Sequence, residues 1–289
     1  MTGSRPGETL TGAPDALARK ASAENFPVAA RFLPRAIRED LMAVYGFARF
    51  VDDLGDELPG GPEARLRALD EAEGQLDRAA TGQASHPVFT RLAPVVNSGR
   101  VPLQAFRDLI EANRLDQSVS TYTTFDDLLG YCRLSANPVG RIVLGLAGLG
   151  GDSEAVRLSD DVCSALQVIE HLQDVKEDAV QGRVYLPEKD LAEFGVDRSE
   201  LFGTSASPAL RRLVAFEASR AGGLLRSGAP LTRRLHGLWR FAVAGYAGGG
   251  LAQLQAIERA AYDVLAKPAK ATRARVAISS LRLFLGRQV

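Results

Sequence analysis

Acidic residues repeat at helical spacing in the middle of this 289-residue chain. Glu170, Asp174 and Asp178 lie four residues apart, so on a helix they stand one above another on one face, with Gln167 one turn earlier. Like charges stacked in this way cost a helix roughly a few tenths of a kcal/mol per pair, and a bound cation would remove that cost. Because Mg²⁺ prefers a few carboxylates and completes its shell with water or phosphate oxygens, the spacing indicates a magnesium site.

A second acidic segment occurs earlier in the chain. Asp52, Asp53 and Asp56 fall on one helical stripe together with Tyr45 and Arg49. Two such helices facing one another would hold metal ions between their carboxylates, and the ions would bridge an anionic diphosphate. Arg49 would add a direct charge-assisted contact. Taken alone, each acidic segment equally fits a solvated, charged helix face.

The elements that must position these residues are helices. Apolar residues recur at helical spacing along most of the chain, and no long stretch alternates as a strand does. Proline and glycine punctuate the pattern, most clearly at 59–62 and at Gly182. Helices are predicted over residues 16–25, 34–56, 63–80, 86–96, 102–116, 125–149, 163–181, 208–226, 231–265 and 272–286. Pro138 is expected to kink the segment 125–149.

This pattern predicts an all-α protein. We expect a flexible N-terminal tail over residues 1–15 and a single-domain helical bundle over residues 16–289, with its site between facing helices. Thirty-five basic and thirty-five acidic residues cancel, so no overall field would attract nucleic acid. Two cysteines, no signal peptide and no membrane-spanning run favour a reduced, cytoplasmic setting.

The last part of the chain, Lys267 to Val289, is basic and holds no acid. Ile278, Leu281, Phe284 and Leu285 form an apolar stripe in it. Two interpretations are open: a helix in peripheral contact with the inner face of a membrane, or a terminal helix docked on the core with its basic residues in water.

Both acidic segments resemble motifs of a known family. Asp52-Asp53-Leu-Gly-Asp56-Glu57 is similar to the first aspartate-rich motif of the squalene and phytoene synthases. The segment 167–178, followed by Gly182-Arg183-Val-Tyr185-Leu186-Pro187, is similar to the second. The resemblance runs from Glu24 to Leu265 and implies a helical bundle of the isoprenoid synthase type with a central cavity. Glu170 departs from the family, which mostly has Asn at that position, and Gln173 stands where many relatives carry Arg.

The resemblance implies a role for each site residue. Two or three Mg²⁺ ions would be held by six carboxylates: Asp52, Asp53, Asp56, Glu170, Asp174 and Asp178. The diphosphate would be bound by Arg49, Arg183 and Tyr185. Catalysis would involve Tyr45, Arg49, Asp52 and Asp174. The substrate pocket would be lined by Phe26, Tyr131, Ser135, Asn137 and Gln167.

One segment points to a branch of the family. Ser135-Ala136-Asn137-Pro138 stands where squalene and phytoene synthases usually have a small apolar run. Together with the segment 24–27 and Glu170-His171, it is most similar to the hydroxysqualene synthases of bacterial hopanoid pathways. That branch ionises presqualene diphosphate and quenches the cation with water. Ser135 or Asn137 would hold that water, or would instead form a hydrogen bond within the kinked helix.

Three functions are therefore compared. The first is a hydroxysqualene synthase that needs no nicotinamide, in keeping with the glycines at 148–151, which lack the spacing of a dinucleotide loop. The second is a head-to-head prenyl transferase making squalene, phytoene or presqualene diphosphate. The third is a non-catalytic helical scaffold, against which the presence of both acidic clusters argues. The sequence does not indicate an oligomeric state.

Overall fold

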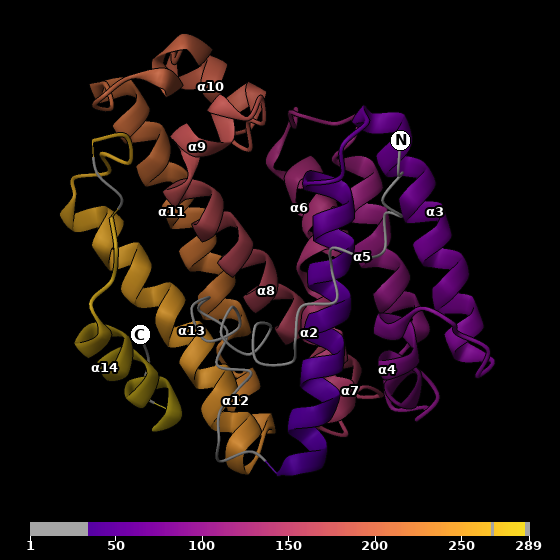
Figure 1. Ribbon diagram of the computed structural model, residues 1–289. Coiled ribbons are helices and arrows are strands. Elements are labelled where there is room, and N and C mark those ends of the chain that lie inside the picture. Colours follow the sequence, from indigo (N-terminus) through magenta and orange to yellow (C-terminus); the bar gives the residue numbers. More distant parts are fainter. Residues whose placement is uncertain (1–33, 267–268, 287–289) are drawn as a thin grey trace. The chain divides into compact units, whose positions relative to one another are not determined.

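The computed structural model describes residues 34–266 and 269–286, and its regular elements are helices (Figure 1). No strand occurs in this described part, where Thr121 and Val184 form only an isolated parallel bridge. The all-α expectation is therefore confirmed. The chain comprises two compact units, residues 1–117 and residues 118–289. The tail over residues 1–15, the short helix over residues 16–25 and Phe26 lie outside the described residues.

The first unit has four helices among its described residues, 34–117. They are α2 (Arg35–Asp56), α3 (Gly61–Ala80), α4 (Pro87–Val96) and α5 (Leu103–Leu115). At its centre the Phe47 ring meets Phe89 and Phe106 edge to face, at centroid distances of 5.7 and 5.3 Å. All three rings are fully buried. Because such contacts add to the hydrophobic gain of burial, they fix α2, which carries the first acidic segment.

The second unit holds the remaining elements. They are α6 (Phe125–Ser135), α7 (Asn137–Leu146), α8 (Ser153–Gln173), α9 (Val175–Val180), α10 (Glu188–Phe194), the 3₁₀ helix η2 (Arg198–Phe202), α11 (Pro208–Gly228), α12 (Leu231–Arg234), α13 (Gly237–Arg259) and α14 (Arg273–Phe284). In this unit α8 packs against α7, α11 and α13. A Cβ at Gly140 would lie 2.4 Å from Ser159 Oγ, and one at Gly228 would lie 2.6 Å from Leu158 O. These glycines allow the close approach of α7 and α11 to α8.

The helix predicted over residues 163–181 is interrupted. It is divided at Asp174, whose φ of −105° and ψ of 16° leave the helical region. The amides of Asp174 and Asp178 still donate to the carbonyls of Glu170 and Asp174, at 3.1 and 2.8 Å. No proline or glycine lies there, and the like charges four residues apart add a small cost to a continuous helix.

Other boundaries also differ from expectation. The single helix predicted over residues 231–265 is wrong, because Leu235 and His236 are extended and separate α12 from α13. Ala261 and Tyr262 adopt positive φ angles beyond the end of α13. The helix α10 was not predicted. The expected kink beside Pro138 is confirmed as the division between α6 and α7 at Ala136. None of the described helices is both long enough and apolar enough to cross a membrane.

Candidate active site

The first acidic cluster lies at the C-terminal end of α2. Arg49 Nε is 2.8 Å from Asp53 Oδ1, and one terminal nitrogen of Arg49 donates to Glu57 Oε1 at 3.2 Å. Arg49 is 29% exposed, so its guanidinium is reachable by a ligand. Tyr45, one turn earlier, is buried. The structure thus joins Arg49 to the acids beside it, as the helical spacing indicates.

Asp52 is positioned by a residue that the sequence analysis missed. Asn113 Nδ2, from α5, donates to Asp52 Oδ1 at 3.2 Å and also to the carbonyl of Leu109 at 3.1 Å. Asn113 fits there because residue 55 is glycine: a Cβ at Gly55 would lie 2.2 Å from Asn113 Oδ1. The sequence could have indicated a role for Asn113, because this polar residue lies four positions after Leu109 on the buried face of a helix.

The environment of Asp52 shifts its titration. Water reaches its side chain, but the surrounding protein removes part of the hydration of the carboxylate. This desolvation is the main cause that raises the pKa of Asp52 to about 6. Asp56 and Asp53 add to the rise, whereas the bond from Asn113 and the charge of Arg49 oppose it. A cation nearby would stabilise the ionised form of this partly desolvated carboxylate.

The second acidic cluster spans the break between α8 and α9. Desolvation first, and the neighbouring acids second, raise the pKa values of Glu170 and Asp174. Asp178 Oδ2 is buried, and no hydrogen-bond donor reaches it within the described residues. His171 Nδ1 lies 3.6 Å from this oxygen, which is beyond hydrogen-bond distance. This oxygen of Asp178 would therefore gain from a bound cation.

His171 lies against three predicted site residues, which its position beside the acidic stripe did not indicate. Its Nε2 lies 3.1 Å from Gln167 Nε2, and its ring stacks on Tyr185 with a centroid distance of 3.5 Å and an angle of 11°. If the Gln167 amide donates to Nε2, the proton of the neutral ring is on Nδ1 and points toward Asp178. The contact between Gln167 and His171 could have been predicted, because the two residues are four positions apart on one helix.

Tyr131 and Tyr185, expected at the pocket and at the diphosphate, belong to one aromatic cluster with Tyr122. Tyr185 stacks on Tyr122 at 5.8 Å, and Tyr131 lies 5.5 Å from Tyr122 and 5.8 Å from Tyr185. Backbone bonds hold the two segments together: Val184 N donates to Ser120 O, and Glu188 N donates to Tyr122 O. Tyr122 was missed because its segment carries no motif.

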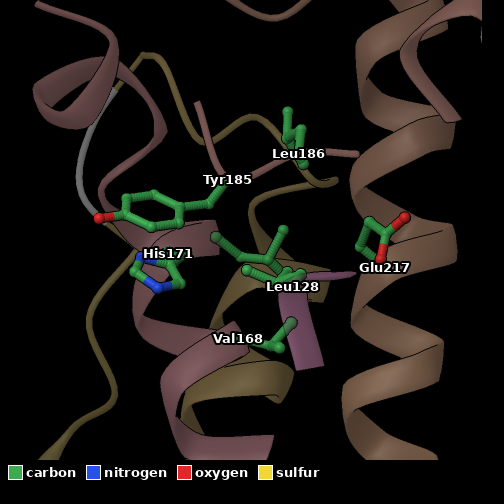
Figure 2. Close-up of a pocket in the computed structure, with 7 residues that line it drawn as sticks. Leu128, Val168, His171, Tyr185, Leu186 and Glu217 are labelled. Atoms are coloured by element: carbon green, nitrogen blue, oxygen red, sulfur yellow. The ribbon is translucent and has the colours of Figure 1, made fainter. Parts of the chain in front are cut away.

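A small cavity of about 10 Å³ lies beside this cluster, which is room for about one water molecule. Figure 2 shows His171 and Tyr185 on one side and Glu217 on the other, with Leu128 and Val168 between them. Glu217 is 1% exposed. Burial is the main cause that raises its pKa to about 8, Arg220 opposes the rise, and Asp190 adds to it. Asp190 accepts a hydrogen bond from Glu217 only while Glu217 is protonated.

The remaining predicted pocket residues are used within the fold. Ser135 Oγ donates to the carbonyl of Tyr131 at 3.3 Å, a bond within one helix. Asn137 is buried, and its Oδ1 accepts from Ser164 Oγ at 3.0 Å. Arg183 follows Gly182, whose φ of +82° suits glycine, and its amide donates to Asp178 O at 2.9 Å. A role of Ser135 or Asn137 in holding water stays a prediction.

The donor chemistry of both clusters fits magnesium. The acids offer oxygen atoms only, and several have raised pKa values. One buried oxygen of Asp178 receives no hydrogen bond from the part of the chain that the structure describes. Within each unit, no three described His, Cys, Asp or Glu side chains gather into a group that would hold a metal ion alone. Each cluster would thus supply one or two ligands to an ion, with water or phosphate oxygens completing its shell. That the two clusters face one another also stays a prediction.

Comparison with known proteins decides the family. The model of the squalene/phytoene synthase family matches residues 19–281, nearly the whole chain. The chain belongs to the squalene/phytoene synthase family. Its motifs at 52–57 and 167–187 both lie inside the matched region. The family indicates an isoprenoid synthase, in agreement with the helical fold.

Individual relatives of the squalene/phytoene synthase family agree with this assignment. The chain is 34% identical to the hydroxysqualene synthase of Zymomonas mobilis, over 74% of this chain and 71% of that protein. It is 35% identical to the phytoene synthase of Mycobacterium tuberculosis, over 70% and 67% of the two chains. The crystal structure of squalene synthase HpnC from Alicyclobacillus acidocaldarius is similar with a TM-score of 0.79 and 41% identity, covering 86% of this chain and 94% of that one.

Proposed function

We propose that this chain is a magnesium-dependent hydroxysqualene synthase, which ionises presqualene diphosphate and quenches the carbocation with water. The observation that carries the proposal is the similarity to hydroxysqualene synthases, including that of Zymomonas mobilis. The polar residues Ser135 and Asn137, in place of a small apolar run, favour this branch. Both acidic clusters are present in the chain, with departures from the family at Glu170 and Gln173.

Each step assigns a task to residues of this chain. The carbon–oxygen bond of presqualene diphosphate breaks, and the electron pair leaves with the diphosphate. Arg49 and Arg183 would bind the departing oxygens, because positive charge there stabilises the transition state. Mg²⁺, bound by Asp52, Asp53, Asp56, Glu170, Asp174 and Asp178, would neutralise the same oxygens.

The cation left behind is a cyclopropylcarbinyl cation, whose ring opens before capture. The faces of Tyr131 and Tyr185 would stabilise positive charge near them. A water oxygen then bonds to the cationic carbon and loses a proton, which gives hydroxysqualene. No hydride is consumed, so no nicotinamide is required. Ser135 or Asn137 would orient the water if its present hydrogen bond is exchanged for one to water.

The test is incubation of the purified protein with presqualene diphosphate and Mg²⁺ in ¹⁸O-labelled water, without nicotinamide. We expect a C30 alcohol that carries ¹⁸O, together with released diphosphate. Asp174→Asn should abolish both products. Asp161→Asn on α8, where an ion pair with Arg157 is partly exposed, should leave them unchanged.

A second candidate is a head-to-head prenyl transferase, which the similarity to phytoene synthases favours. Phytoene formed from geranylgeranyl diphosphate, with no turnover of presqualene diphosphate, would establish it in place of the first. If no prenyl diphosphate releases pyrophosphate, a non-catalytic scaffold becomes the explanation.

A further inference from the structure

An exposed apolar surface lies on the pair formed by α13 and α14. It consists of Phe241 on α13, Ile278 and Leu281 on α14, and Leu285 directly after α14, each at least 53% exposed. Phe284 links the two helices, because its ring lies 6.4 Å from that of Phe241. Large apolar side chains gathered on one surface mark an interaction site more often than single ones do. We call these four residues the α13–α14 surface.

Apart from Phe284, the apolar stripe of α14 does not serve to dock this helix on its neighbour. α14 packs on α13, and its buried side chains are Ser279 and Leu283, which are 5% and 4% exposed. Figure 1 shows the two helices side by side. A terminal helix that was merely docked would turn its larger apolar side chains inward, whereas Ile278, Leu281 and Leu285 point to solvent. Their exposure therefore requires a separate explanation.

This surface is held in place by close packing. A Cβ at Gly248 on α13 would lie 2.4 Å from Ser280 N, so the two helices cross nearly backbone to backbone. Arg240 donates to the carbonyl of Phe284 at 2.6 Å, and its guanidinium lies 4.9 Å from the centre of that ring. The apolar side chains are thus presented by a fixed pair of helices, in contrast to a loose tail.

The charges around this surface have one sign. α14 carries Arg273, Arg275 and Arg282 and no acid, and α13 carries no acid before Glu258. Arg275 and Arg282 are exposed and follow the apolar stripe along the helix. Apolar side chains next to arginines match the boundary between acyl chains and anionic headgroups.

We propose that the α13–α14 surface binds the face of a membrane that contains anionic phospholipid. The apolar side chains would enter the acyl boundary, while the arginines would meet the headgroup phosphates. Because no described helix is long and apolar enough to span a bilayer, the contact is peripheral. This proposal holds whichever product the enzyme makes, since it concerns binding in the absence of substrate.

The test is sedimentation of the full chain with vesicles, without substrate. One set contains phosphatidylcholine alone, and the other contains one third phosphatidylglycerol. We expect binding to the second set, weakened by salt. Phe241→Ser or Leu281→Ser should lower the partition coefficient about tenfold, since each removes a large apolar group from the lipid contact. The matched control is Phe202→Ser in the same unit, because Phe202 is also 53% exposed but lies on η2.

The charge contribution has its own variant. Arg275→Gln with Arg282→Gln should weaken binding to anionic vesicles about thirtyfold at low salt, whereas Arg212→Gln with Arg226→Gln on α11 should not. Equal binding to both vesicle types, or an equal loss in the Phe202 control, would overturn the proposal. So would light scattering that shows Leu281→Ser separating two copies of the chain while vesicle binding is unchanged. Circular dichroism melts verify that each variant is folded.

Discussion

Asn113 Nδ2 donates to Asp52 Oδ1 at 3.2 Å, although the two residues are 61 positions apart in the chain. This bond ties the first acidic cluster to α5 and fixes one carboxylate of the motif. It exists because Gly55, inside the motif itself, leaves space for the Asn113 side chain. The glycine of the motif therefore has a structural task that is separate from metal binding.

Replacing Gly55 by alanine should disturb this arrangement. The new methyl group would meet Asn113 Oδ1, so we expect a loss of roughly 1–3 kcal/mol in the free energy of unfolding, and slower pyrophosphate release. Gly46→Ala on the same helix has open space around it and should instead gain about 1 kcal/mol from helix propensity. Urea unfolding measures both. A Gly55→Ala protein as stable and active as the parent would contradict the role given to Asn113.

Arg49 should matter for the chemistry, beyond its ion pairs. Arg49→Ala is expected to slow pyrophosphate release at least about tenfold, because a charge-assisted contact to the leaving group is lost. Arg35→Ala is the control on the same helix, since Arg35 forms an exposed pair with Glu39. The measurement is the rate of pyrophosphate release by each variant at saturating substrate. Equal rates in the two variants would remove Arg49 from the diphosphate site.

His171 should influence the affinity for magnesium through Asp178. His171→Phe keeps a ring to stack on Tyr185 but removes the nitrogen 3.6 Å from Asp178. We expect the Mg²⁺ concentration for half-maximal activity to change about tenfold or more, as outer-shell substitutions commonly do. Calorimetry of Mg²⁺ binding in the presence of inorganic diphosphate gives a readout apart from turnover. An unchanged Mg²⁺ affinity would show that His171 serves only in packing.

Glu217 should make stability depend on pH. Because its folded pKa is about 8 and therefore lies above the ordinary value of 4.5, its contribution is complete below pH 4.5 and is lost as the pH rises through 8. From pH 6 to pH 9 the loss is on the order of 2 kcal/mol. Glu217→Gln cannot ionise and still donates to Asp190, so its stability should change less over this range. Parallel urea titrations at both pH values test this, and identical pH dependence of the two proteins would refute it.

Much of the fold could be predicted from sequence, because proline and glycine set the boundaries. The four helices in the described part of the first unit were predicted close to their observed limits. The interruption at Asp174 was not predicted, since no proline or glycine lies at that break. The interruption at Leu235 was missed although Gly237, with a φ of +55°, follows it directly at the start of α13. α10 was missed because its seven residues are too few for a periodic pattern.

The site could be predicted only where residues share a helix. Arg49 with Asp53 follows from the spacing of four residues. Asn113, Tyr122 and Glu217 come from other helices or from loops, so their contacts depend on packing that no local pattern describes. The stacking of His171 on Tyr185 was not predicted, because Tyr185 lies beyond the turn at Gly182.

The interruption at Asp174 divides the second motif between two helices: Glu170 lies on α8 and Asp178 on α9. The position of α9 is fixed by the segment around η2, since Lys176 Nζ donates to the carbonyl of Gly203 at 2.8 Å and α9 packs on η2. Shortening or lengthening the turn before Gly203 would therefore move Asp178 while leaving Glu170 where α8 holds it. An engineer could in this way adjust the spacing between the carboxylates without changing any of them.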